Sequence, residues 1–167
     1  MLKIVKSVNE LNIEQFFAVY RDSIRNIGHD FYCNFHENQQ VKLAEEDLLA
    51  YLRDDFFRHM DAFIAIWVVD GVYKSVLRIE PYRHGVLLHA LETAPDARKM
   101  GYAFSLVSAV LEYLKQAECV AVFSHVNKRN HPSLHLHKKC GFRKSTDFAV
   151  LLDGTVTQNT CTMTLKF

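Results

Sequence analysis

The segment that decides the fold is LETAPDARKMGYAF, residues 91–104. It begins as the end of a strand, turns at a proline and enters a helix near Gly101. A helix N-terminus carries unpaired N–H groups and the positive end of the macrodipole, which suits phosphate. Gly101 and Ala103 keep bulk away from that end, and Arg98 and Lys99 add positive charge. The segment indicates a pyrophosphate cradle, although an ordinary basic turn into a core helix has the same features.

A second segment, NKRNHPSLHLHKKCGF at residues 127–142, follows one strand later. Together the two segments resemble the GNAT superfamily of acyl-CoA N-acyltransferases. The first resembles that family's R/Q-x-x-G-x-G/A motif, carried here by Arg98, Gly101 and Ala103. The second resembles its N-x-x-(S/A)-x-x-L-Y-x-K-x-G-F motif, carried here by Asn130, Ser133, Leu136, His137, Lys139, Gly141 and Phe142.

The pattern on either side of these segments predicts a layered α/β domain over residues 1–167. Period-2 and buried-type runs predict strands, and period-3.6 stripes predict helices. We expect a helix capped by Ser7 or Asn9 and running through Tyr20, and an irregular stretch at 22–40 because glycine and asparagines interrupt the pattern there. The expected strands are 2–6, 62–69, 72–80, 86–93, 119–125, 142–152 and 155–167, and the other expected helices are 44–57, about 101–114 and 132–139.

This order predicts an α+β layered fold with a mixed, largely antiparallel sheet of about seven strands and about four flanking helices. The resemblance implies the same fold from the first strand to the last. The net charge of +1 gives no broad attraction to nucleic acid or to an anionic membrane. No leader-like segment, membrane-spanning run or zinc spacing of the four cysteines occurs, so we expect a reduced, cytoplasmic protein without a metal.

The resemblance implies acetyl-CoA as the acyl donor. In the family the pantetheine arm lies between two splayed strands and bonds to the backbone of the first, here at Leu91 and Thr93. The pyrophosphate would rest on the backbone amides from Lys99 to Phe104. The cofactor-binding residues expected on this basis are Leu91, Thr93, Arg98, Lys99, Met100, Gly101, Tyr102, Ala103, Phe104 and Asn130.

Three histidines are candidates for proton transfer, because direct attack by an amine on a thioester requires a general base and is helped by a general acid. His137 stands where the family often has a tyrosine acid, and histidine titrates near neutral pH. The base is His125, at the end of its strand, or His89, which strand alternation places on the same face as Leu91 and Thr93 and opposite Glu92. Packing or hydrogen bonding alone would also account for each of the three.

Two charged residues on the preceding strand, Arg78 and Glu80, alternate onto one face. They would line an acceptor pocket or form a solvated face, and we favour the solvated face. His131 and His135 share a helix face at a spacing that a metal could use, but a solvated face is again the better expectation.

The function expected is transfer of an acetyl group from acetyl-CoA to a primary amine of a small molecule or of a protein N-terminus or lysine. The alternative is a catalytically weak CoA-binding module that senses or binds a partner, because the family's usual tyrosine and its histone-type glutamate are both absent. The sequence leaves homodimerisation open and does not identify the acceptor.

Overall fold

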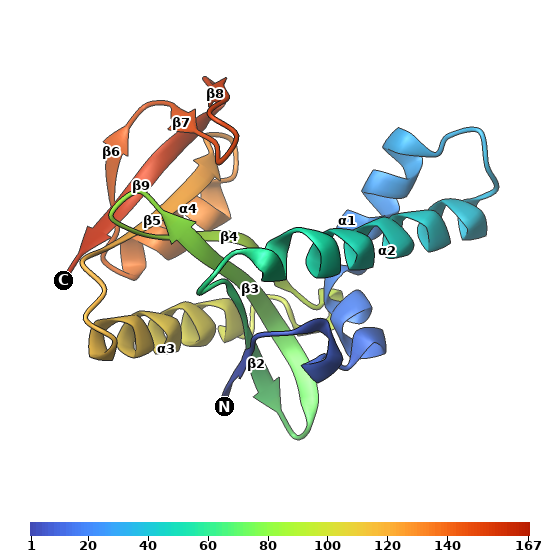
Figure 1. The fold of residues 1–167 in the computed structure, drawn as a ribbon, viewed down its shortest axis with the longest axis horizontal. Coiled ribbons are helices and arrows are strands. Elements are labelled where there is room, and N and C mark those ends of the chain that lie inside the picture. The colour runs from blue at the N-terminus through green and yellow to red at the C-terminus, as the bar shows by residue number, and fades with distance from the viewer.

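The computed structural model describes residues 1–167, and its largest feature is a seven-stranded sheet with helices on both faces (Figure 1). One neighbouring pair, the strands Gly85–Thr93 and Ala121–Asn127, is parallel, and every other neighbouring pair is antiparallel. In spatial order the strands are β1 (Leu2–Val5), β2 (Phe63–Val69), β3 (Val72–Tyr82), β4 (Gly85–Thr93), β5 (Ala121–Asn127), β9 (Thr160–Lys166) and β6 (Arg143–Thr146).

Four α-helices accompany this sheet, which confirms the predicted α/β fold. They are α1 (Ile13–Phe31), α2 (Glu37–Asp54), α3 (Tyr102–Gln116) and α4 (His131–Lys139). The predicted closing hairpin is more elaborate than expected. Between β6 and β9 in the chain, β7 (Ala149–Val150) and β8 (Val156–Thr157) form a separate two-stranded sheet. Three short 3₁₀ helices span Val8–Glu10, Phe56–Arg58 and Pro95–Ala97.

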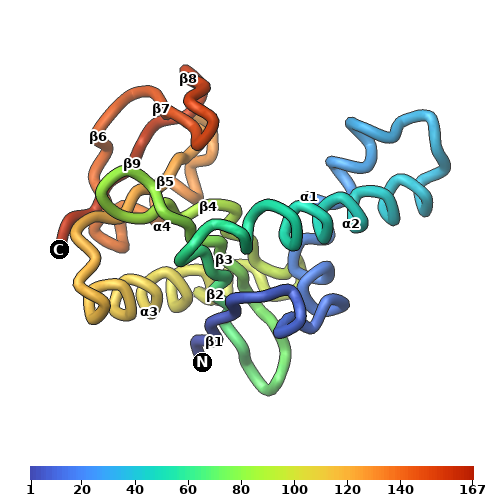
Figure 2. Tube along the Cα trace, viewed as in Figure 1, coloured from blue at the N-terminus to red at the C-terminus, as the bar shows by residue number.

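The sheet separates two apolar cores. One core packs α1 and α2 against one face of the sheet, with Phe16, Leu52 and Phe56 fully buried. The other packs α3 and α4 against the opposite face, around Leu106 and Met163. The chain trace shows the far ends of α1 and α2 standing off at one side and the C-terminal strands lying at the other (Figure 2).

The irregular stretch predicted for residues 22–40 is wrong, because α1 continues to Phe31 and α2 begins at Glu37. Gly28 does not break α1. A Cβ at this position would lie 2.8 Å from the carbonyl oxygen of Gln40, so the glycine allows the two helices to approach closely. The predicted cap was also wrong, since α1 starts later, where the Asn12 side chain accepts from the backbone N–H of Gln15.

The parallel strands β4 and β5 are tightly joined at one end and separate at the other. At the joined end a Cβ on Gly85 would lie only 2.0 Å from the carbonyl oxygen of Ala121. Pairing then runs from Val86 with Val122 to Leu88 with Ser124 and stops there. The remaining half of β4 therefore has no strand partner on its β5 side.

A bulge lies in β4 at this same point. Arg78 of β3 pairs with His89 and Val76 pairs with Glu92, so two β4 residues, Ala90 and Leu91, oppose a single β3 residue. Ala90 has φ of 50°, and its rotated carbonyl accepts from the hydroxyl of Tyr20 in α1 at 2.6 Å.

The bulge corrects the side-chain alternation expected for this strand. Leu91 packs into the core under α3, whereas His89 lies against Phe56 on the α1–α2 face. Glu92 also faces α1, where its carboxylate accepts from the hydroxyl of Ser23 at 2.6 Å. His89 thus shares a face with Glu92 and not with Leu91 or Thr93, because the extra residue reverses the alternation.

Candidate active site

A small cavity of about 170 Å³ occupies the space where β4 and β5 separate. It receives side chains from both faces of the sheet, because the two strands no longer close the layer between them. The three predicted histidines and Asn130 all line it, although they come from three different elements. The lining residues are Leu77, Leu88, His89, Ala90, Leu91, Val107, Ser124, His125, Val126, Asn127, Asn130, Ser133 and His137.

The N-terminus of α3 provides a row of free backbone donors. No N–H group from Lys99 to Phe104 donates to another protein group, and the first amide of the helix that does so is Ser105, to the carbonyl of Gly101 at 3.0 Å. Gly101 adopts φ of 84° with open space where a Cβ would lie. These features are those of an anion site at a helix N-terminus, flanked by an exposed lysine at position 99.

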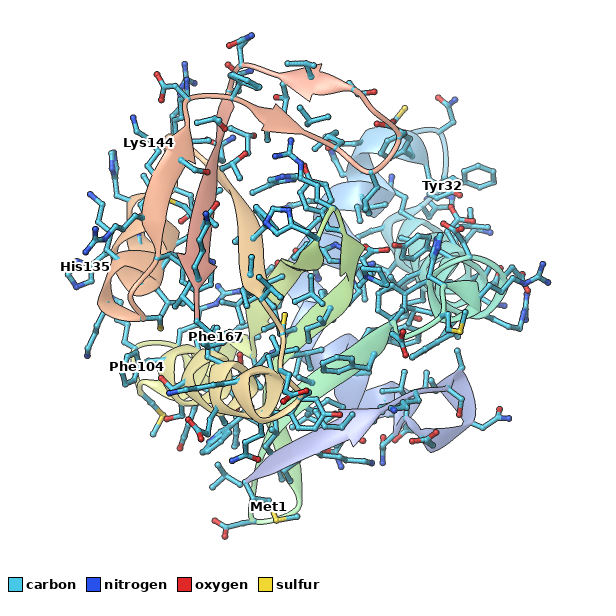
Figure 3. All side chains as sticks on the ribbon, turned by 60° about the vertical axis from the view of Figure 1, so that its left-hand side comes forward. Met1, Tyr32, Phe104, His135, Lys144 and Phe167 are labelled. Carbon is cyan, nitrogen blue, oxygen red and sulfur yellow. The ribbon has the colours of Figure 1, made fainter.

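The charged and aromatic residues of this segment have distinct surroundings. Arg98 forms an ion pair with Asp22 of α1 at 2.7 Å, so its charge is partly satisfied within the protein. The ammonium group of Lys139 lies over the ring of Phe104, 4.3 Å from the ring centre, and Phe104 is labelled beside α3 in Figure 3. Lys99 is exposed and has no ion pair with any carboxylate.

His137 is buried in α4 and points its ring into the cavity. Its Nδ1 lies 2.8 Å from the carbonyl oxygen of Ser133, and its ring edge rests on Phe142. This contact favours the tautomer with hydrogen on Nδ1, which leaves the lone pair of Nε2 facing the cavity. Burial lowers the pKa of His137, more than the contact with the Ser133 carbonyl raises it. The ring is therefore mainly neutral at pH 7.

His89 is paired with a buried carboxylate. Its Nε2 lies 2.5 Å from Oε1 of Glu80, whose side chain is nearly inaccessible to solvent. The two atoms are close without the alignment of a good hydrogen bond, so the contact is chiefly one of charge. Burial lowers the pKa of His89 and the Arg78 charge lowers it further, while Glu80 opposes both. Nδ1 has no protein partner and remains open to solvent.

His125 lacks such support. Its ring stands edge-on to Tyr82 at 5.3 Å, and its Nε2 is buried without a partner. Burial lowers the pKa of His125, with smaller contributions from Arg83 and His89. No carboxylate contacts the ring to stabilise a proton on it. Of the two predicted bases, only His89 has an acidic partner.

For Glu80 and Arg78, the sequence favoured a solvated face over a place in an acceptor pocket. The expected solvated face is wrong, because Glu80 is only 2% exposed and the Nε of Arg78 is buried without a partner. The available signal was an arginine and a glutamate that alternate with the apolar residues Leu77 and Ile79. The placement of His89 beside them was not readable from the sequence, because it depends on the register of β3 with β4, which pairs Arg78 directly with His89.

The other histidine pair behaves as expected from its position. His131 and His135 are both exposed, and His135 lies on the outer side of α4, away from the cavity (Figure 3). No cluster of three or more histidine, cysteine, aspartate or glutamate side chains is arranged to hold a metal ion. None of the helices combines the length and the apolar character needed to cross a bilayer.

Comparison with known proteins gives a consistent result. Residues 17–142 match the family described as Acetyltransferase (GNAT) family. No curated protein matches the sequence.

Among solved structures, the chain is similar to the PaiA N-acetyltransferase of Thermoplasma acidophilum in complex with coenzyme A, with a TM-score of 0.67 and 14% identity over 100% of this chain and 99% of that one. It is also similar to a ribosomal-protein-alanine N-acetyltransferase from Brucella melitensis, with a TM-score of 0.66 and 17% identity over 100% and 99%. A third similar structure is an IAA acetyltransferase from Bacillus cereus, with a TM-score of 0.65 and 11% identity over 100% of this chain and 99% of that one. At these identities the similarity shows the shared fold.

Proposed function

Because the chain belongs to the acetyltransferase (GNAT) family, we propose that it transfers an acetyl group from acetyl-CoA to an amine, with His89 as the general base. The observation that carries the proposal is the cavity between β4 and β5, which is lined by His89 from one face of the sheet and by residues of α3 and α4 from the other. The free amides lie at the N-terminus of the same helix α3, and Glu80 contacts the ring of His89. We treat residues 1–167 as one domain, because both cores pack against the same sheet.

The residues present fit acetyl-CoA. The unpaired amides from Lys99 to Phe104 suit a pyrophosphate, as backbone donors at a helix N-terminus generally do. The unpaired edge of β4 beyond Leu88 would accept the amides of a pantetheine arm as a neighbouring strand would, through Leu91 and Thr93. When bound, acetyl-CoA supplies an activated thioester carbonyl. Asn130 is less free than expected, because its side-chain oxygen caps α4 by accepting from the N–H of Ser133.

His89 then has the properties that a base requires. Its lowered pKa keeps it neutral at pH 7, and its Nδ1 is open to an incoming amine or to a bridging water. As the ring takes the proton, Glu80 stabilises the imidazolium that forms. His125 remains the less favoured base because it has no such partner.

His137 has a narrower role in this proposal than its motif position suggested. A neutral ring whose Nδ1 hydrogen points at Ser133 presents an acceptor to the cavity, which suits an N–H of the cofactor arm. It would donate a proton to the leaving sulfur only in its charged form, and burial disfavours that form above acidic pH.

The first test is calorimetric titration with acetyl-CoA, using desulfo-CoA and ATP as controls, followed by an amine panel with thiol release as the readout. We expect micromolar binding that needs the pantetheine arm and turnover that is lost in His89→Gln but kept in His135→Gln, its exposed counterpart. Acetyl-CoA binding without turnover of any amine would leave the alternative, a CoA-binding module. Absence of binding by the folded protein would reject both.

A further inference from the structure

Arg78 is a cation without a counter-ion inside the α1–α2 face of the sheet. Its guanidinium lies over the ring of Tyr51, 5.2 Å from the ring centre, and its Nε is buried without a hydrogen-bond partner. It takes part in none of the ion pairs of the protein. A partly buried arginine normally meets a carboxylate, because an unpaired charge loses hydration without compensation.

The carboxylates on the same face are engaged elsewhere. Glu80 contacts His89, and Glu92 accepts from Ser23 in α1. Tyr51 stacks on the guanidinium and Tyr20 bonds to the Ala90 carbonyl, so neither supplies an anion. The pKa of Tyr20 is raised above its usual range by burial, which keeps its hydroxyl neutral.

The position of Arg78 relates this free charge to the proposed chemistry. Arg78 and His89 are direct partners in the β3–β4 pairing, and both project onto the α1–α2 face. Side chains of directly paired residues begin about 5 Å apart. A small ligand that reaches the imidazole therefore also reaches the guanidinium.

We propose that Arg78 is the carboxylate-binding residue of the acceptor site and that the acceptor is a small amino acid-like amine, with its carboxylate on Arg78 and its amine directed to His89. The inference rests on the proposed acetyltransferase function. A carboxylate would complete the arginine by forked hydrogen bonds. An amine without a nearby anion would instead bring a second positive charge next to Arg78, which disfavours polyamines and protein lysines.

The test compares matched acceptors. A panel of free amino acids, including β-alanine, is assayed beside the corresponding carboxamides, in the native protein and in Arg78→Gln and Arg78→Lys. We expect the acids to be preferred, and Arg78→Gln to lower kcat/KM for the acids by about 10- to 100-fold, as loss of a charged hydrogen bond does. The kcat/KM for the carboxamides should change little in Arg78→Gln. Arg78→Lys should recover part of the lost kcat/KM for the acids, and acetyl-CoA affinity should stay constant in both variants. Arg143→Gln, on the exposed strand β6, is the matched control.

Two outcomes overturn the proposal. One is equal use of acids and carboxamides by the native protein. The other is an equal loss for both classes in Arg78→Gln, which would mean that Arg78 acts only on His89 or on folding, and thermal unfolding of the variant separates those two.

Failure of the subsite and failure of the function remain distinguishable. If acetyl-CoA binds but no amine is acetylated, the proposed function fails, and the subsite is judged by calorimetry of the free acids on the protein–CoA complex. Binding that disappears in Arg78→Gln supports the subsite, and no binding overturns it.

Discussion

At the scale of single residues, the chemistry depends on how burial and neighbouring charges set the proton affinity of each histidine. Three histidines line one cavity, and burial lowers the pKa of all three. They differ in their partners: a carboxylate for His89, a carbonyl for His137 and an aromatic ring for His125. These partners, and not the histidines alone, assign the roles proposed here.

Glu80 gives the sharpest prediction at this scale. Its charge raises the pKa of His89 against the lowering by burial, so Glu80→Gln should lower that pKa further. The base must be unprotonated, so activity rises with pH through the His89 pKa. The acidic limb of the kcat profile should therefore move to lower pH, and the plateau should fall by about tenfold or more because the imidazolium is less stabilised.

The control for this prediction is Glu112→Gln on the exposed side of α3, which should leave the profile unchanged. If the acidic limb of the kcat profile of Glu80→Gln lies at the same pH as in the native protein, Glu80 is not a positioning residue for His89.

His137→Phe tests whether this residue binds the cofactor or donates a proton. The substitution keeps an aromatic ring against Phe142 and removes both nitrogens. We expect acetyl-CoA to bind about 5- to 30-fold more weakly at pH 7.5, because an arm N–H loses its acceptor. His135→Phe on the outer side of α4 is the control. Unchanged affinity with a large fall in kcat would instead favour the general acid.

At the scale of secondary-structure elements, the cavity forms because two adjacent strands pair closely at one end and separate at the other. Gly85 contacts the carbonyl of Ala121 closely at the paired end, and the strands separate after the last pair, Leu88 with Ser124. His89 precedes the bulge and lies on the α1–α2 face with its partner Arg78, whereas the bulge at Ala90 moves Leu91 to the opposite face. Helices α3 and α4 complete the cavity from that other side.

Gly85→Ala should therefore damage both stability and binding. A Cβ would overlap the Ala121 carbonyl, and separating the strands costs about 1–3 kcal/mol, as overpacking generally does. Gly71→Ala is a matched control, because its positive φ of 77° adds strain of about 1 kcal/mol without any clash. Denaturant unfolding and acetyl-CoA titration measure the two effects. Equal losses of stability and of acetyl-CoA affinity in both variants would contradict the role of Gly85 in the close pairing of β4 and β5.

At the scale of the whole molecule, the protein buries ionisable groups around its central cavity, and folding is therefore linked to pH. The histidines have folded-state pKa values below the usual 6.5, so the unfolded chain binds more protons as the pH falls through that value. Stability should be fully present above pH 6.5 and should decrease below it.

Thermal unfolding at pH 7.5, 6.5 and 5.5 measures this dependence. We expect the melting temperature to fall toward pH 5.5, and to fall less steeply in His125→Phe, which removes one of these groups and keeps the edge-on contact with Tyr82. His135→Phe, being exposed, should retain the native slope. A melting temperature independent of pH over this range would contradict the burial argument.

The sequence by itself determined the fold class, the order of the elements and the position of the helix N-terminus that we propose binds phosphate, because these follow from local periodicity and from glycine at a left-handed turn. It also named the histidines that meet in the cavity. The sequence wrongly predicted an irregular segment in place of the end of α1 and the start of α2. Gly28 is typical of a helix break, but here it allows α1 to approach Gln40 of α2 closely.

Only the tertiary structure decided which histidine has a carboxylate partner and that the half-buried Arg78 has none. Strand alternation assumes an unbroken pleat, and a single extra residue in β4 reverses the face of every side chain after it. Such a bulge is fixed by pairing with β3 and by the Tyr20 hydroxyl that holds the Ala90 carbonyl, both of which are contacts between distant parts of the chain.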